Sequence, residues 1–70
     1  MRITDNEIAA ALRNPEKECN RKYLNDVYLD WYIDFLTVDG FASYYDLPLA
    51  VAERAIDKGR EINYEIGEIK

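Results

Sequence analysis

The chain has 70 residues, which is enough for one domain with a small hydrophobic core. Its net charge of −5 argues against broad phosphate binding, because nucleic-acid affinity depends largely on Lys and Arg. No apolar run approaches the roughly 18 residues that a membrane span requires, and residues 1–5 lack the apolar core of a signal peptide. With Cys19 as its single cysteine, we expect a cytoplasmic domain without a disulfide and without membrane contact.

The N-terminal residues predict a short helix with a defined start and end. Thr4 and Glu7 have the spacing of a capping box, in which Thr4 is the N-cap of a helix over residues 5–13. Asn14 then ends this helix and caps the next one, which has Pro15 at its first position.

The second predicted helix, over residues 15–36, is the longest element. Residues four apart neighbour one another on a helix, so its sequence divides into rows. Three rows are mainly apolar or aromatic, and the fourth is purely acidic. The rows are Tyr23, Val27, Trp31 and Phe35; Leu24, Tyr28, Tyr32 and Leu36; Asn25, Leu29 and Ile33; and Asp26, Asp30 and Asp34.

Two further helices are predicted in the C-terminal half. Thr37 has the character of an N-cap for a helix over residues 38–45, and Pro48 stands at the first position of a fourth helix. Gly59 either ends that helix or lies within a longer helix where another helix approaches. Residues 60–66 fit both a continuing helix and a short strand, and we favour the helix.

The C-terminal half carries a pattern of cap and core residues, namely Leu36, Thr37, Val38, Ala42, Leu47, Ile56, Gly59 and Ile62. Through this pattern it resembles the helix-turn-helix of the MerR and excisionase class, and it also looks like small bacteriophage proteins that carry such a segment near their C-terminus. The length and the predicted helices indicate a single all-α domain over residues 1–70, and the resemblance, which covers about 28 residues, implies a helix-turn-helix-like pair at 36–62. Because these are cap and core positions, they bear on fold more than on function.

The segment departs from its family where DNA contact would occur. A recognition helix inserts its N-terminal residues into the major groove, and here Arg54 is the only cation in that part. Glu53 beside it would repel the phosphate backbone, and Lys58 and Arg60 are the only other nearby cations. We favour a pair of helices kept for packing. The alternative is a DNA-binding helix-turn-helix that contacts DNA through Arg54, Lys58 and Arg60.

The residues needed for catalysis are missing from the sequence. There is no histidine, which removes the commonest general base and metal ligand. Cys19 lacks a histidine partner, Ser43 is the only serine, and the glycines are isolated rather than grouped in a phosphate-binding loop. We therefore expect no enzymatic activity, no cofactor and no metal site.

The acidic row Asp26, Asp30 and Asp34 has two interpretations. It is either a solvated face that keeps an apolar helix soluble, or a ridge that docks onto a basic surface. Carboxylates at this spacing lie about 6 Å apart along a helix and form a regular row of negative charge, as phosphates do along a nucleic-acid strand. Such a ridge could imitate nucleic acid.

The aromatic rows exceed what so small a domain can bury around one helix. Some of Tyr28, Leu29, Tyr32 and Ile33 should therefore be exposed in a monomer. An exposed apolar surface rich in tyrosine marks an interface, either in a symmetric homodimer or with a partner protein.

These observations lead to three hypotheses of function. The first is a non-enzymatic protein-binding module of the kind that a phage encodes to inhibit a host nucleic-acid-binding or defence protein. Its binding residues would be Asp26, Asp30, Asp34, Tyr28, Tyr32, Leu29 and Ile33. The second is a DNA-binding transcriptional regulator, and the third is a self-associating structural subunit.

Overall fold

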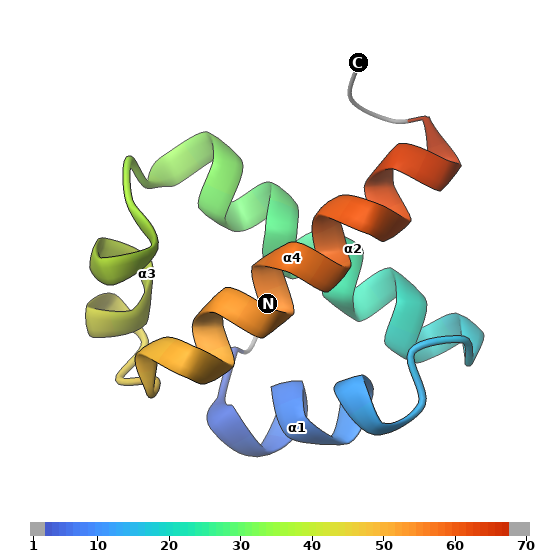
Figure 1. Cartoon of the computed structure of the whole chain (residues 1–70), viewed down its shortest axis with the longest axis horizontal. Helices are drawn as coiled ribbons and strands as arrows, with labels where there is room; N and C mark the ends of the chain where they lie inside the picture. Colours follow the sequence, from blue (N-terminus) through green and yellow to red (C-terminus); the bar gives the residue numbers. More distant parts are fainter. Residues whose placement is uncertain (1–2, 68–70) are drawn as a thin grey trace.

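Four helices follow one another along the chain in the computed structural model, which describes residues 3–67 (Figure 1). The helices are α1 (Asp5–Arg13), α2 (Glu18–Asp34), α3 (Val38–Tyr44) and α4 (Leu49–Ile66). No strand occurs within the described range. The predicted all-α, four-helix class is confirmed, and the chain from Arg60 to Ile66 is helix rather than the alternative strand.

Side-chain caps fix the starts of α1 and α3, as the sequence predicts. The hydroxyl oxygen of Thr4 accepts a hydrogen bond from the Glu7 amide at 3.2 Å. That of Thr37 accepts one from the Gly40 amide at 3.0 Å. Each bond satisfies an amide that has no partner within its helix.

The connection between α1 and α2 differs from the prediction. Asn14 is the C-cap of α1, and it does not cap α2. Its carbonyl accepts hydrogen bonds from the Lys17 amide at 3.3 Å and from Asn20 Nδ2 at 3.0 Å. These bonds hold a separate turn, so α2 begins at Glu18 rather than at Pro15.

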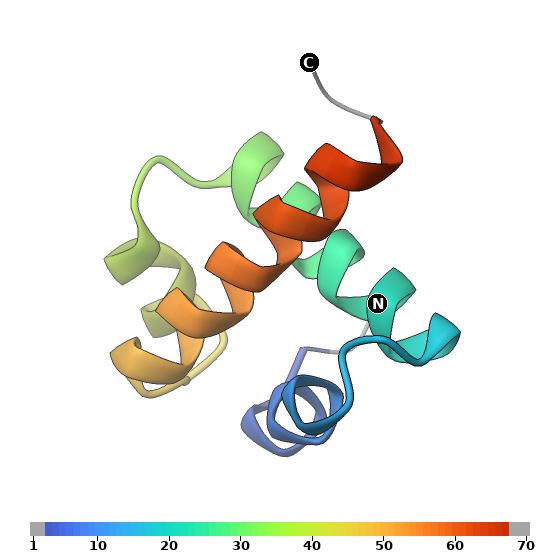
Figure 2. The same cartoon turned by 45° about the vertical axis from the view of Figure 1, so that its right-hand side comes forward.

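Helix α4 crosses α2 at the centre of the molecule, while α1 and α3 pack beside the N-terminal half of α4 (Figures 1 and 2). Gly59 is buried at this crossing. A Cβ atom at Gly59 would collide with the Leu24 carbonyl oxygen and would lie 2.6 Å from Tyr28 Cβ. Gly59 therefore lies within one long helix and allows the two backbones to approach.

The core lies around this crossing and draws on every helix. The largest fully buried side chains are Ile8, Leu24, Val27, Phe41, Ile56 and Ile62. Two buried polar residues also meet there, with Asn63 Nδ2 donating a hydrogen bond to Asn25 Oδ1 at 2.9 Å. Towards the C-terminal end of α4, Arg21 pairs with Glu65 at 2.8 Å.

Candidate protein-binding site

The chain turns from α2 into α3 through a pair of residues that point in opposite directions. Phe35, the C-cap of α2, has extended backbone angles and packs edge-on against Phe41, with ring centroids 5.4 Å apart. Its ring also contacts that of Tyr44 at 5.5 Å. Because neighbouring side chains in an extended segment alternate in direction, Leu36 points into solvent.

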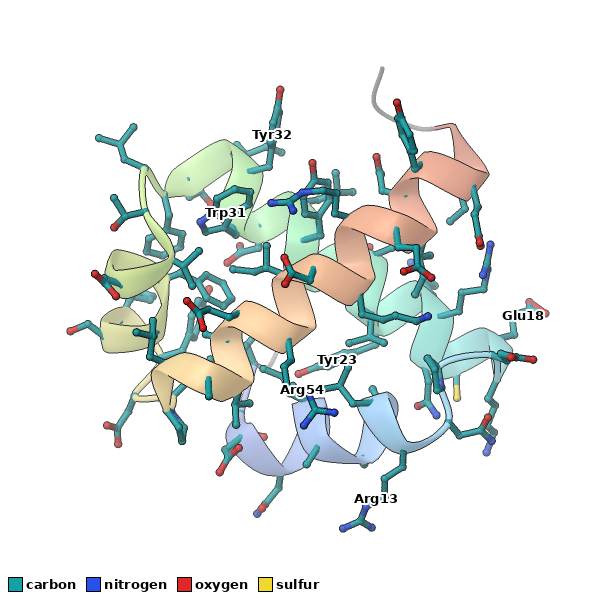
Figure 3. The ribbon with its side chains drawn as sticks, in the orientation of Figure 1. Arg13, Glu18, Tyr23, Trp31, Tyr32 and Arg54 are labelled. Atoms are coloured by element: carbon teal, nitrogen blue, oxygen red, sulfur yellow. The ribbon has the colours of Figure 1, made fainter. Side chains whose placement is uncertain are left out.

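Large apolar side chains are exposed on the C-terminal part of α2, on the α2–α3 connection and on α3. They and their exposed fractions are Tyr32 (54%), Ile33 (73%), Leu36 (98%) and Tyr44 (73%). Figure 3 shows Tyr32 extending away from the helices. We call these four residues the α2–α3 patch.

The surroundings of the α2–α3 patch are acidic. Asp34 and Asp39 are exposed beside it, and the sequence between Tyr23 and Glu53 contains no Lys or Arg. Docking a basic partner here would bring opposite charges together without displacing a local ion pair.

Tyr45 binds one of the nearby carboxylates. Its hydroxyl donates a hydrogen bond to Asp30 Oδ2 at 2.7 Å. Burial, together with this bond and the charge of Asp30, raises the pKa of the Tyr45 hydroxyl to about 12. The neutral, donating form of Tyr45 therefore persists at all physiological pH values.

The predicted acidic row does not present three equal carboxylates. Asp26 is partly buried and pairs with Lys22 at 3.3 Å, while Asp30 is partly buried and bound by Tyr45. Asp34 is the only exposed member of the row. Of the three carboxylates in this row, the one that is free to contact a partner therefore lies at the C-terminal end of α2.

The predicted aromatic surface is divided between the interior and the patch. Tyr32 and Ile33 are exposed, and Leu29 is partly buried against the core. Tyr28 is 7% exposed because it faces α4 at the helix crossing, where the Arg60 guanidinium lies 5.9 Å from its ring centroid. The sequence predicts Tyr28 on the binding surface, but a side chain buried in this way is not available to contact a partner.

Sequence reasoning missed two members of the patch, Leu36 and Tyr44. Leu36 precedes the N-cap Thr37, where an apolar residue often packs against the fourth residue of the helix, here Phe41. Phe35 makes that contact instead. The extra aromatic residue before Leu36 was the available signal, since only one of two adjacent side chains can point inward.

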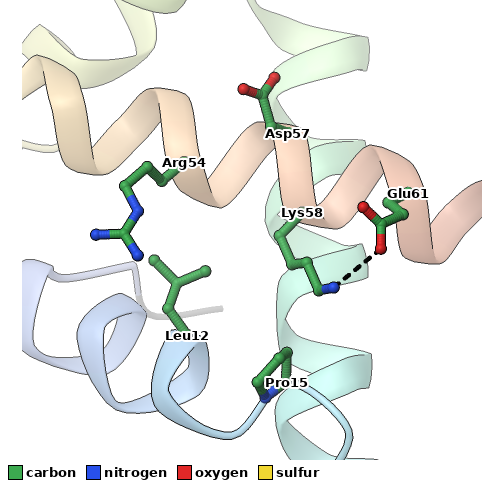
Figure 4. Close-up of a pocket in the computed structure, with 6 residues that line it drawn as sticks. All are labelled: Leu12, Pro15, Arg54, Asp57, Lys58 and Glu61. Atoms are coloured by element: carbon green, nitrogen blue, oxygen red, sulfur yellow. Dashed lines mark hydrogen bonds and ion pairs between the residues drawn. The ribbon is translucent and has the colours of Figure 1, made fainter.

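The cations of the DNA-binding alternative lie on α4. Lys58 pairs with Glu61 at 2.9 Å and Arg60 with Asp57 at 3.3 Å, so two of the three already contact carboxylates on the same helix. Arg54 is exposed and points towards α1 beside Leu12 (Figure 4).

The turn between α3 and α4 contains one residue in a conformation that favours glycine. Asp46 has a positive φ of 57°, in the left-handed region that Asp adopts more readily than most side chains. The carbonyl of Ala42 accepts a hydrogen bond from the Leu47 amide at 2.8 Å. Together they fix the direction in which α4 leaves the turn.

Comparison of the chain with protein-family models, curated proteins and solved structures finds no match. The resemblance to the MerR and excisionase class therefore stays a prediction from sequence. Within residues 3–67, no helix has the length and apolar character to cross a bilayer. The same residues contain no group of three metal-ligating side chains arranged to hold an ion.

Proposed function

We propose that this chain is a non-enzymatic protein-binding module that contacts its partner through the α2–α3 patch. The observation that carries the proposal is the nearly full exposure of Leu36 on the α2–α3 connection, together with the exposure of Ile33 on the last turn of α2 and of Tyr44 on α3. Leu36 contributes almost nothing to the core in this conformation, because apolar side chains stabilise a fold only through the area they remove from water.

The composition of the patch fits a protein interface. Tyrosine is enriched at interfaces, since it supplies a large contact area with few rotatable bonds. Tyr32 precedes the α2–α3 connection and Tyr44 follows it, and their rings contact those of Trp31 and Phe35, respectively. A partner would therefore meet side chains that are already partly ordered.

The partner's surface should offer an apolar hollow rimmed by Lys or Arg. Nucleic-acid-binding proteins present basic surfaces of this kind, because they must contact phosphates. On the resemblance to small phage proteins, we extend the proposal to inhibition of a host nucleic-acid-binding or defence protein.

Capture experiments with matched variants test the proposal. The immobilised wild type, Leu36→Asp and Tyr64→Asp are incubated with nuclease-treated bacterial lysate. Tyr64 is 82% exposed near the end of α4, so its variant controls for the loss of an exposed apolar side chain elsewhere. We expect a protein that the wild type and Tyr64→Asp retain and Leu36→Asp loses. Equal retention by all three would refute the patch as the binding site.

A further inference from the structure

A second surface feature lies between α1 and α4. It is a hollow of about 280 Å³ lined by Ala9, Leu12, Arg13, Val51 and Arg54. We call it the α1–α4 groove. Leu12 and Arg54 also line a neighbouring hollow, so the groove continues along α4 towards Lys58 (Figure 4). Its aliphatic surface comes from Ala9, Leu12 and Val51.

Three cations within residues 3–67 have no carboxylate partner, and two of them line the α1–α4 groove, while the third, Lys17, lies outside it. Arg13 and Arg54 are exposed, and neither has an ion pair or hydrogen bond through its side chain within residues 3–67. Four other cations in that range do have carboxylate partners: Arg21, Lys22, Lys58 and Arg60. Two arginines without carboxylate partners beside aliphatic side chains have the chemistry to receive an acidic, apolar ligand.

The α2–α3 patch has that chemistry. Leu36 is a fully exposed aliphatic side chain, and Asp34 and Asp39 stand exposed on either side of it in the sequence. We propose that the α2–α3 patch of one copy docks into the α1–α4 groove of a second copy. Leu36 then covers Leu12, and the two aspartates face the arginines. This inference rests on the proposed function, because it assigns a partner to the same patch.

The contact is head-to-tail rather than symmetric. The α2–α3 connection and the α1–α4 groove lie on opposite sides of α4 (Figures 1 and 3). Each copy can therefore use its patch and its groove at the same time, with different neighbours. Self-association occupies the patch, so an external partner must compete with the groove of another copy and present similar chemistry.

Complementary variants test the inference by sedimentation velocity over a concentration series. The weight-average mass of the wild type should rise with concentration and fall with added salt. Leu36→Asp retains a groove and loses the patch, whereas Arg54→Asp retains a patch and loses the groove. Each variant alone should remain monomeric at concentrations where the wild type associates. Their equimolar mixture should form a one-to-one dimer and nothing larger.

Two control variants test whether any change of an exposed residue affects association. Tyr64→Asp and Lys17→Asp change exposed residues outside both surfaces and should associate like the wild type. The inference is wrong if Arg54→Asp associates as strongly as the wild type. It is also wrong if the wild type stays monomeric while Leu36→Asp still abolishes capture. Both outcomes leave the proposed function standing. Wild-type behaviour of Leu36→Asp in both association and capture overturns both. Loss of duplex DNA binding in Arg54→Asp with unchanged association makes the groove a phosphate site and overturns the inference.

Discussion

The hydroxyl of Tyr45 donates a hydrogen bond to Asp30 Oδ2 at 2.7 Å, and this bond joins the C-cap of α3 to the C-terminal part of α2. The Tyr45 ring also contacts Phe35 and Phe41, at 6.1 and 5.1 Å between centroids. The phenol therefore ties the acidic row to the aromatic cluster beneath the α2–α3 patch. Its loss should loosen the support of the patch as well as the fold.

Tyr45→Phe should lower the free energy of unfolding by about 1 kcal/mol at neutral pH, since it removes one hydrogen bond to a charged acceptor and keeps the ring. Urea denaturation followed by circular dichroism measures the change. Tyr44→Phe is the control, because Tyr44 is exposed and should tolerate the substitution without measurable cost. Equal losses in the two variants would show that the bond to Asp30 contributes nothing specific.

The same bond predicts a dependence on alkaline pH. The Tyr45 hydroxyl has a pKa of about 12 in the folded protein against an ordinary value of 10.0. The folded state therefore holds a proton that the unfolded state releases first, so this stabilisation is complete below about pH 10 and is lost as pH rises towards 12. The stability difference between wild type and Tyr45→Phe should accordingly be constant from pH 7 to 9 and shrink above pH 10. A difference that stays constant through pH 11 contradicts the raised pKa.

Gly59→Ala should be among the most destabilising single methyl additions in this chain, by about 3 kcal/mol or more. The new Cβ would meet the Leu24 backbone carbonyl and lie 2.6 Å from Tyr28 Cβ, so α2 and α4 would have to separate. Gly67→Ala is the comparison. That glycine has a φ of 77° and open space around it, so its cost is backbone strain alone, about 1 kcal/mol. Thermal unfolding of both variants gives the order, and a smaller loss for Gly59→Ala would contradict the close crossing.

The buried amide pair between α2 and α4 should behave as a coupled unit. Asn63→Leu removes the Nδ2 group that donates a hydrogen bond to Asn25 Oδ1 at 2.9 Å. This substitution should lower the free energy of unfolding by about 1–3 kcal/mol. Adding Asn25→Leu should recover part of that loss, because Asn25 Oδ1 is then no longer buried without the donor that Asn63 supplied. A double-mutant cycle by urea denaturation measures the coupling, and additive losses would show that the two amides act independently.

Local chemistry accounts for the parts of the fold that the sequence predicts correctly. Thr4 and Thr37 cap their helices through side chains that bond amides three residues away, so no tertiary contact is needed to recognise them. The long fourth helix follows from continuous spacing of apolar residues up to Ile66. Gly59 lies within this helix because the backbone of α2 approaches it at Leu24, and the structure identifies α2 as that neighbour.

The predictions that fail depend on competition between neighbouring groups. Asn14 could cap either helix, and its carbonyl is engaged by Lys17 and Asn20 in a turn that periodicity does not encode. Tyr28 and Tyr32 lie on one row of α2, but α4 crosses α2 close to Tyr28, so Tyr28 is buried and Tyr32 is exposed. The candidate site therefore could be placed on α2 from the sequence, while its centre at the α2–α3 connection could not.

Duplex DNA provides the test of the helix-turn-helix alternative. Because Lys58 and Arg60 are paired with carboxylates, we expect the wild type to bind duplex no more tightly than the non-specific range, with a dissociation constant of about 10⁻⁴ M at physiological salt. Fluorescence anisotropy with a labelled duplex measures this affinity. Binding several orders of magnitude tighter, reduced in Arg54→Ala with a shallower salt dependence, would instead identify a DNA-binding regulator.

Phe35 and Leu36 are adjacent at the start of the α2–α3 connection, but substitutions at the two positions should change stability by very different amounts. Phe35 packs against the rings of Phe41 and Tyr44, so Phe35→Ala should lower the free energy of unfolding by about 2–3 kcal/mol. Leu36 is 98% exposed, so Leu36→Asp should change stability by no more than about 0.5 kcal/mol, even though it inserts a charge in place of a large apolar side chain. Urea denaturation of the two variants under conditions where the protein is monomeric separates these effects from association. A large loss in Leu36→Asp would mean that Leu36 packs against Phe41 in solution, and the α2–α3 patch would then lack its most exposed member.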